Sequence, residues 1–228
     1  MTSIAERLKI VKERLVSAET AVGRTPGAVI LVAVSKTQPA SSIKEAWRAG
    51  QRHFGENYLQ EALAKQLELA DLDLVWHFIG PIQSNKTRLI ASHFDWVHSV
   101  DRLKVAERLN EQRSENLPPL NICLQVNISD EASKSGVSLA ELPVLAAQVA
   151  KLPRLRLRGL MAIPEPSEGM ETQRVPLKRL RLALESLHVP DMDMLSMGMS
   201  DDLDAAVMEG AGLVRVGSAI FGARPVKD

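Results

Sequence analysis

Two patterns of apolar residues alternate along the chain. Short runs rich in β-branched residues predict buried strands. Between these runs, segments such as "DRLKVAERLNEQR" and "LAELPVLAAQVAKL" carry apolar residues at intervals of three and four, which is typical of amphipathic helices. Strand followed by helix, repeated, predicts a parallel sheet. The predicted strands are residues 29–35, 51–54, 74–79, 95–99, 121–127, 157–163, 193–197 and 213–216.

The number of strand–helix units favours a closed barrel. Eight units in a chain of 228 residues suit a single (β/α)8 TIM-type barrel, which usually has about 250 residues. A doubly wound open sheet is the alternative, because the runs at 51–54 and 95–99 are short enough to belong to loops. No linker rich in Gly, Ser or charge interrupts the alternation, so we expect one domain over residues 1–228. The stretch "MTSIAERLKIVKERLVSAE" predicts an additional N-terminal helix and not the apolar core of a signal peptide.

Composition and charge limit the partners and the location that we expect. The formal net charge is zero, and Lys and Arg are scattered through the helical segments, so nothing indicates a nucleic acid or an anionic membrane as partner. No apolar run approaches the roughly 20 residues that span a bilayer. The one cysteine, Cys123, cannot form an intrachain disulfide and suits a small core residue in a reducing compartment. We therefore expect a cytoplasmic protein, and a monomer because no strongly apolar surface helix stands out.

A lysine stands at the end of the first predicted strand. In "LVAVSKTQPA", an apolar run leads directly into Ser35 and Lys36, and the next residues end its regularity. A flexible cation at a strand end usually extends its charged group into water. The alternative is a nucleophilic amine at the mouth of the barrel, where it forms a Schiff base. Active sites of such barrels lie at the C-terminal ends of the strands, and this is where Lys36 is placed.

Two later segments resemble anion-binding sites. In "GMSDD", Gly198 allows a tight turn and Ser200 takes the N-cap position of the helix "DDLDAAVMEG". In "VGSAIFG", Gly217 and Ser218 begin another short helix directly after the eighth strand. Each segment alone is usually only a helix cap. Together they fall in the loops after strands seven and eight, which form the recurrent phosphate site of this barrel.

Arg215 lies between valines in the last predicted strand, and a buried cation needs a partner. In the structural interpretation, an acidic residue on a neighbouring strand is that partner. In the functional interpretation, Arg215 donates to the ring nitrogen of a pyridine cofactor and keeps it unprotonated, which weakens the ring as an electron sink. His77 in "WHFIG" either stacks on a ligand or forms hydrogen bonds in the core. No cluster of His, Cys and Asp has the spacing of metal ligands, so we expect no zinc site.

Several motifs together resemble one known family. They are "AVSKTQPA", "FGENYLQEA", "WHFIGPIQSNK", "VNISDEASKSG", "RGLMAIP", "LSMGMSDDLDAA" and "VRVGSAIFGAR", and they extend from about residue 28 to residue 224. The chain resembles the pyridoxal 5′-phosphate (PLP) homeostasis proteins of the YggS/PROSC family, whose fold is similar to the barrel domain of alanine racemase. The stretch 164–190 fits the family pattern less well, because Pro176 falls near the start of its expected helix.

The resemblance implies a role for each candidate residue. PLP would be bound as an internal aldimine on Lys36, and Arg215 would face the pyridine nitrogen. The resemblance places Ser200, Gly217 and Ser218 at the phosphate, and Asn57, His77 and Met199 along the cofactor.

Three functions remain open for such a site. They are a PLP enzyme of the racemase type, a PLP-binding protein that buffers, carries or regulates the cofactor, and an aldolase-like lyase that uses Lys36 on a phosphorylated sugar. A two-base racemase needs a second acid or base, commonly a tyrosine from an additional domain, whereas this chain holds one tyrosine, Tyr58, and ends soon after its last motif. The aldolase hypothesis leaves Arg215 without a role. We therefore favour a protein of vitamin B6 homeostasis that buffers PLP or supplies it to apo-enzymes, with little or no catalysis.

Overall fold

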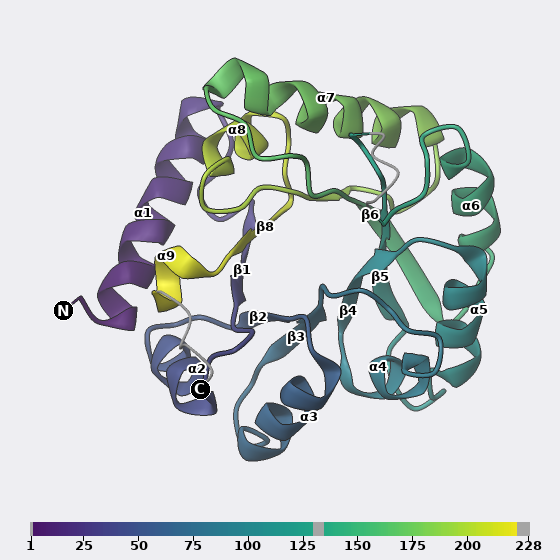
Figure 1. Ribbon diagram of the computed structural model, residues 1–228, viewed down its shortest axis with the longest axis horizontal. Helices are drawn as coiled ribbons and strands as arrows, with labels where there is room; N and C mark the ends of the chain where they lie inside the picture. Colours follow the sequence, from purple (N-terminus) through teal and green to yellow (C-terminus); the bar gives the residue numbers. More distant parts are fainter. Residues whose placement is uncertain (1, 130–134, 223–228) are drawn as a thin grey trace.

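The computed structural model describes residues 2–129 and 135–222. The described residues form a closed barrel of parallel strands in which each strand pairs with its neighbours along the chain and β8 pairs with β1. Figure 1 shows the helices arranged around this barrel. The closed sheet confirms the (β/α)8 fold and excludes the doubly wound alternative, because an open sheet has no pairing between its first and last strands. That residues 1–228 form one domain stays a prediction.

All the predicted strands occur, and their ends differ from the prediction by at most two residues. The shift reaches two residues at both ends of β2 and β6 and at the C-terminal end of β5. The strands are β1 (Ile30–Val34), β2 (His53–Glu56), β3 (Val75–Phe78), β4 (Trp96–Val100), β5 (Leu120–Gln125), β6 (Leu155–Met161), β7 (Met194–Ser196) and β8 (Leu213–Val216).

Helices follow the strands as the apolar periodicity predicts. In the described part of the chain they are α1 (Ile4–Ala21), α2 (Ala40–Arg48), α3 (Leu59–Glu68), α4 (Thr87–His93), α5 (Leu103–Gln112), α6 (Leu142–Val149), α7 (Met170–Leu187), α8 (Leu203–Met208) and α9 (Ser218–Phe221).

Helix α7 is long despite its internal proline. It has 18 residues and includes Pro176. A proline inside a helix removes one backbone hydrogen bond. The helix nevertheless continues past it, and Leu177 and Leu180 on its inner face are fully buried. The departure from the family pattern in this stretch therefore does not shorten the helix.

The N-terminal helix α1 packs against the last part of the chain. Its apolar residues Leu8, Val11 and Leu15 are buried, and its start is fixed by a capping box between Ser3 and Glu6. The helix contacts α8, α9 and α2, and Figure 1 shows it lying beside α8 and α9. The predicted N-terminal helix is thus confirmed, and it supports the two elements that follow β7 and β8.

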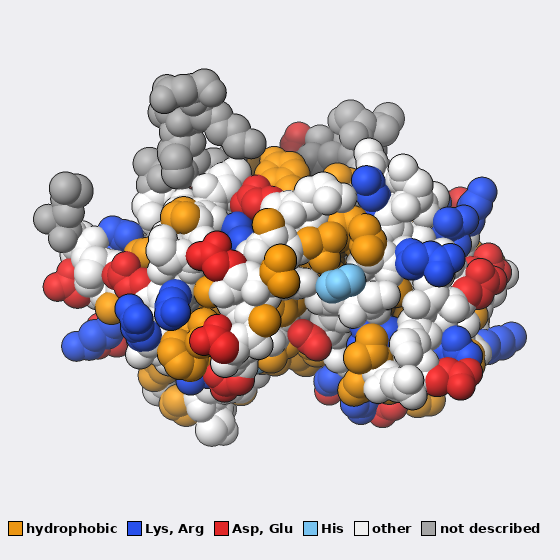
Figure 2. Space-filling view, turned by 90° about the horizontal axis from the view of Figure 1, so that it is seen from below, with side chains coloured by type: hydrophobic (Ala, Val, Ile, Leu, Met, Phe, Trp, Pro, Cys, Tyr) orange, Lys and Arg blue, Asp and Glu red, His pale blue; other side chains and the backbone are white. Residues whose placement is uncertain are grey.

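The surface carries charges of both signs. On the face seen in Figure 2, acidic and basic side chains both occur, with several Lys and Arg side chains near one another toward the right of the view. No helix in the described part of the chain is both long and apolar enough to cross a membrane.

Candidate functional site

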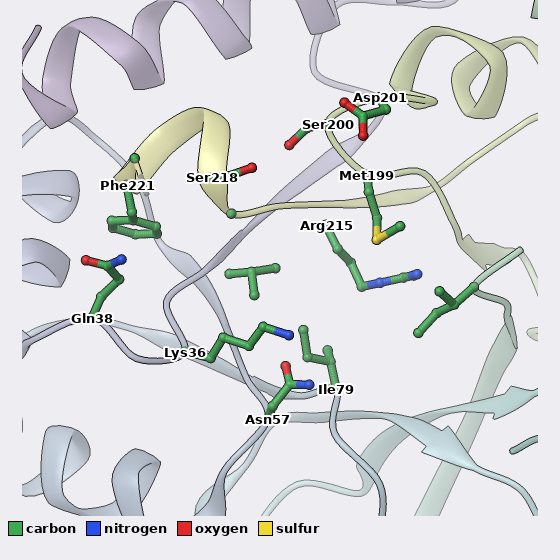
Figure 3. Close-up of a pocket in the computed structure, with 14 residues that line it drawn as sticks. Lys36, Gln38, Asn57, Ile79, Met199, Ser200, Asp201, Arg215, Ser218 and Phe221 are labelled. Carbon is green, nitrogen blue, oxygen red and sulfur yellow. The ribbon is translucent and has the colours of Figure 1, made fainter. Parts of the chain in front are cut away.

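A pocket of about 280 Å³ opens at the C-terminal ends of the strands. This volume is near the lower limit for pockets that bind small molecules. Figure 3 shows Lys36 and Asn57 entering the pocket from one side, with Ser200 and Ser218 across from them and Arg215 between. The lining residues are Val34, Lys36, Gln38, Asn57, Ile79, Ile163, Met199, Ser200, Asp201, Arg215, Gly217, Ser218, Phe221 and Gly222.

Charged side chains of α3 form hydrogen bonds with the backbone on both sides of Lys36. Thr37, the next residue, has a φ of 64°, which is uncommon for a residue with a β-branched side chain. Its N–H donates to Oε1 of Glu61 at 2.5 Å. On the other side of the lysine, the carbonyl oxygen of Ser35 accepts from Nζ of Lys65 at 2.8 Å. The two residues that flank Lys36 are therefore fixed by side chains of α3.

These contacts belong to a larger buried network. Lys65 also donates to Oε1 of Glu56 at 2.7 Å and to Oε1 of Glu61 at 2.6 Å. The Ser35 hydroxyl donates to the same oxygen of Glu56 at 2.7 Å. Burial raises the pKa of the Glu56 carboxyl, while the charge and hydrogen bond of Lys65 act in the opposite direction. The network joins the ends of β1 and β2 to α3. It therefore restricts the movement of the backbone segment that carries Lys36.

The loop after β7 brings Ser200 to the pocket without using it as a helix cap. Helix α8 begins at Leu203 with Asp202 at the N-cap position, and Oδ1 of Asp202 accepts from the N–H of Met199 at 2.7 Å. The prediction that Ser200 is the N-cap is therefore wrong. Gly198 has a φ of 91°, and a Cβ there would lie 2.5 Å from Cβ of Ala206. Only glycine fits both constraints, so the structure requires the glycine that the sequence places here.

The loop after β8 agrees with the prediction more closely. Gly217 precedes α9, which begins at Ser218 directly after the last strand. Figure 3 shows the Ser200 and Ser218 hydroxyl groups on the same side of the pocket. The two serines follow different strands, β7 and β8, and the fold brings them together as the phosphate hypothesis requires.

Helix α1 holds both of these loops by arginine side chains. Arg14 donates to the carbonyl oxygen of Ser200 at 2.6 Å and forms an ion pair with Asp204, also at 2.6 Å. Arg7 donates from Nε to the carbonyl oxygen of Ile220 in α9 at 2.7 Å. The N-terminal helix therefore connects the segments that carry the two serines.

Arg215 is 4% exposed and is the buried cation of the site. Its Nη1 donates to the hydroxyl of Ser196 at 2.6 Å, and its Nη2 donates to the carbonyl oxygen of Ala162 at 3.0 Å. No carboxylate of the described residues pairs with it, so the structural interpretation of an acidic partner on a neighbouring strand is wrong. Burial lowers the pKa of Arg215 to about 10, while the more distant Asp202 raises it, and the guanidinium remains charged at neutral pH.

Asn57 and Met199 line the pocket, whereas His77 does not. Oδ1 of Asn57 is buried without a hydrogen-bond partner among the described residues. His77 is completely buried inside the barrel, where its two ring nitrogens contact His53 and His98. Of its two possible roles, the structure gives His77 that of a hydrogen-bonded core residue.

Sequence reasoning did not single out several lining residues. Ile79 and Ile163 follow β3 and β6, so the rule that selected Lys36 at the end of β1 also points to them. Asp201 and Gln38 stand within the motifs, but nothing in their types or spacing indicated that they reach the pocket. The lining residues that were missed are Val34, Gln38, Ile79, Ile163, Asp201, Phe221 and Gly222.

Comparison with known sequences gives close relatives over nearly the whole chain. The model of the family "Alanine racemase, N-terminal domain" matches residues 14–225. The chain is 62% identical over 224 residues to the pyridoxal phosphate homeostasis protein of Pseudomonas aeruginosa, with 98% of this chain and 97% of the relative covered. It is 55% identical over 229 residues to the protein of that name from Escherichia coli, with 98% of each chain covered.

Comparison with solved structures agrees with the sequence relatives. The structure of PipY from Synechococcus elongatus with PLP bound has a TM-score of 0.85 and 41% sequence identity, covering 96% of this chain and 100% of PipY. Alanine racemase from Corynebacterium glutamicum has a TM-score of 0.70 at 17% identity, covering 97% of this chain and 60% of the racemase. At that identity the likeness to the racemase concerns the fold alone.

Proposed function

Because the chain belongs to the pyridoxal phosphate homeostasis proteins, a family built on the alanine racemase N-terminal domain, we propose that it binds PLP covalently through Lys36 and takes part in intracellular vitamin B6 balance. One observation carries the proposal. An amine (Lys36), two hydroxyl groups (Ser200 and Ser218) and a buried guanidinium (Arg215) surround a single pocket.

The groups that line the pocket fit PLP part by part. The Lys36 amine suits the aldehyde, the serine hydroxyls across the pocket suit the phosphate, and the Arg215 guanidinium suits the pyridine nitrogen. The unpartnered Oδ1 of Asn57 adds a buried acceptor, which a ligand with a donor group satisfies. Asp201 also lines the pocket and is the one carboxylate among the described lining residues.

The residues of the chain bind and orient the cofactor. When bound, PLP supplies an aldehyde that condenses with an amine and a ring that withdraws electrons. Lys36 is the covalent attachment point. Glu61 and Lys65 of α3 fix the backbone on both sides of it, and this limits the directions in which its side chain extends. Arg215 donates hydrogen bonds and accepts none, so it keeps the pyridine nitrogen unprotonated and weakens the ring as an electron sink.

We place this protein among cofactor-binding proteins with little or no catalysis. A racemase needs an acid or base on each face of the substrate carbon. Tyr58 is 55% exposed and is not among the residues that line the pocket. Besides Lys36, the titratable residues among the described lining residues are Asp201 and Arg215, and the guanidinium is a poor base. An aldolase-like lyase would leave Arg215 without a role in the pocket.

In this role the protein buffers PLP or supplies it to apo-enzymes that depend on the cofactor. We place it in the cytoplasm and propose that it acts as a monomer. The surface in Figure 2, with its mixed charges, supports neither a nucleic acid nor an anionic membrane as partner.

Titration with PLP tests the binding site. The wild-type protein should develop the visible absorbance band of a Schiff base, and Lys36→Ala should not. Lys178→Ala, which removes an exposed lysine of α7, is the matched control and should behave as wild type. A band that persists in Lys36→Ala would show that another amine carries the cofactor.

Hydrogen exchange separates a carrier from an enzyme. Alanine incubated in deuterium oxide with stoichiometric PLP-loaded protein should show almost no exchange at Cα and no racemisation. The same protein should restore activity to an added apo-enzyme over hours. Rapid, saturable Cα exchange at catalytic protein concentrations would refute the binding function in favour of a racemase.

A further inference from the structure

A row of polar side chains crosses the interior of the barrel, where branched apolar residues are usual. His77, His98 and Ser196 are completely buried, Arg215 is 4% exposed, and His53 is partly exposed at the start of β2. They come from β3, β4, β7, β8 and β2, so five strands contribute one side chain each. Only Arg215 of this row lines the cofactor pocket.

Each member of the row is within hydrogen-bond distance of the next. Nδ1 of His53 lies 2.9 Å from Nε2 of His77, and Nδ1 of His77 lies 2.9 Å from Nε2 of His98. Nδ1 of His98 lies 2.6 Å from Oγ of Ser196, which also accepts from Arg215 at 2.6 Å. The row follows β2, β3 and β4 along the wall, crosses the interior to β7 and ends at β8.

The chemistry of the Arg215 end fixes the direction of every hydrogen bond in the row. Arginine only donates, so Oγ of Ser196 accepts from Arg215. The serine hydrogen then has one acceptor among the described residues, Nδ1 of His98, which must be unprotonated. Nε2–H of His98 donates to Nδ1 of His77, and Nε2–H of His77 donates to Nδ1 of His53. The reverse direction would leave the serine hydrogen buried without an acceptor.

This arrangement requires neutral histidines with the hydrogen on Nε2. Burial, followed by the charge of Arg215, lowers the pKa of His98 to about 3. Burial and the neighbouring histidines lower the pKa of His77 as well. A proton added to Nδ1 of His77 would place two N–H groups opposite one another, and a proton added to Nδ1 of His98 would remove the acceptor of the serine hydrogen. The neutral forms therefore agree with the geometry.

Packing also fixes the rings of the row. The His77 ring stacks on Trp96 with 5.6 Å between ring centroids and 12° between planes. The guanidinium of Arg158 lies 5.4 Å from the centroid of the Trp96 ring. His77 therefore has its plane set by Trp96 and both of its nitrogens used by the row.

We propose that Ser196, His98, His77 and His53 are positioning residues that orient the Arg215 guanidinium for the pyridine nitrogen of the cofactor. Arg215 has no carboxylate partner among the described residues, and Ser196 and the Ala162 carbonyl are its two contacts. The row fixes the Ser196 hydroxyl so that its oxygen accepts from Arg215. The N–H groups of the guanidinium that are not bound to Ser196 or Ala162 remain available to a ligand in the pocket. A donor that is already oriented loses little freedom when the ligand binds. This inference rests on the proposed function.

Nitrogen-15 NMR of the histidine rings in the ligand-free full chain tests the row without any variant. We expect His53, His77 and His98 to be neutral near neutral pH with the hydrogen on Nε2. A charged ring or a hydrogen on Nδ1 at His77 or His98 would overturn the proposal, whatever the protein binds.

The Ser196→Ala variant tests the effect on Arg215. It should weaken PLP about tenfold, as expected for the loss of one hydrogen bond to a charged group, and shift the absorbance maximum of bound PLP. Ser196→Thr keeps the hydroxyl and should restore the wild-type maximum. Thr87→Val is the matched control, because Thr87 in α4 is a buried hydroxyl that also accepts from an arginine, Arg108, and donates to a carbonyl oxygen.

The outcomes separate this proposal from the proposed function. An unchanged affinity and absorbance maximum in Ser196→Ala would overturn the positioning role while PLP binding stands. Equal changes in Ser196→Ala and Thr87→Val would do the same, because they would reflect a general loss of packing. A wild-type protein that does not bind PLP would refute the proposed function and, with it, the role of the row toward the cofactor, even if the histidine tautomers are as expected.

Discussion

Acidification should destabilise the ligand-free protein through His98. The pKa of this ring falls from its ordinary value of 6.5 to about 3 on folding, because burial and the Arg215 charge disfavour the protonated form. Below the ordinary value the unfolded chain binds a proton that the folded protein does not. The stabilisation is therefore fully present above about pH 6.5 and is lost as the pH falls toward about 3.

The size of the effect follows from these two pKa values. For one group with pKa values of 6.5 and about 3, the free energy of unfolding falls by about 2 kcal/mol between about pH 8 and about pH 5. Well below pH 6.5 the slope approaches about 1.4 kcal/mol per pH unit. The pKa values of His53 and His77 are also lowered, so their contributions have the same sign. The wild-type slope should exceed that of a single histidine.

Urea unfolding at a series of pH values measures this slope. His98→Gln removes the titrating ring, so the slope of its unfolding free energy between about pH 7 and about pH 5 should be smaller than that of wild type by about 1 kcal/mol per pH unit. Thr87→Val, which removes a buried hydroxyl but no titratable group, should lower stability and keep the wild-type slope. A His98→Gln slope equal to that of wild type would show that the pKa of His98 does not fall on folding and would refute the reasoning.

Three further substitutions test the pocket. Ser200→Ala should weaken PLP by about one to two powers of ten, since a hydrogen bond to a charged group is worth about 1.5–3 kcal/mol, and should leave the affinity for pyridoxal unchanged in a titration of both ligands. Glu61→Gln weakens the acceptor for the Thr37 N–H and for Lys65, so it should slow the appearance of the Schiff-base band in stopped-flow absorbance. Arg14→Met, which releases the Ser200 carbonyl from α1, should weaken PLP by less than about tenfold, while Lys9→Met on the same helix should have no effect, as binding titrations of both variants will show.

The strand pattern could be predicted from the sequence because burial on both faces of a parallel strand demands a continuous apolar run. The prediction shifted where polar residues interrupt that run. In β6, the exposed Arg156 stands between the buried Leu155 and Leu157, so the apolar run looks as if it begins at Leu157. Before β2, the side chain of Gln51 is buried because it donates to the carbonyl oxygens of Leu31 and His53. The buried residues therefore begin before the strand does, and the predicted strand starts two residues too early.

The residues of the pocket could be predicted in part, because a barrel brings the C-terminal ends of its strands together. That rule selected Lys36, Ser200 and Ser218. It did not select the right cap for α8, where two further residues of the segment offer a side-chain oxygen and Asp202 takes the position. The choice among the adjacent Ser and Asp residues depends on the backbone path after Gly198, which has a positive φ, and the spacing of apolar residues carries no information about that path.

The partner of Arg215 could not be predicted for a different reason. Ser196 and His98 are separated by almost 100 residues of chain, and no local pattern relates a serine at the end of β7 to histidines in β3 and β4. Their contact is made across the barrel interior and depends on side-chain directions. The sequence indicated that a buried arginine needs a partner, but not that a neutral hydroxyl would be that partner.

The identity of the amine that carries the cofactor tests the account most directly. The protein is loaded with PLP, reduced with borohydride, digested and mapped by mass spectrometry. The account predicts a single labelled peptide with the pyridoxyl group on Lys36. A label on any other lysine, with Lys36 unmodified, would contradict the account, because the serine hydroxyls and Arg215 surround the pocket that Lys36 enters.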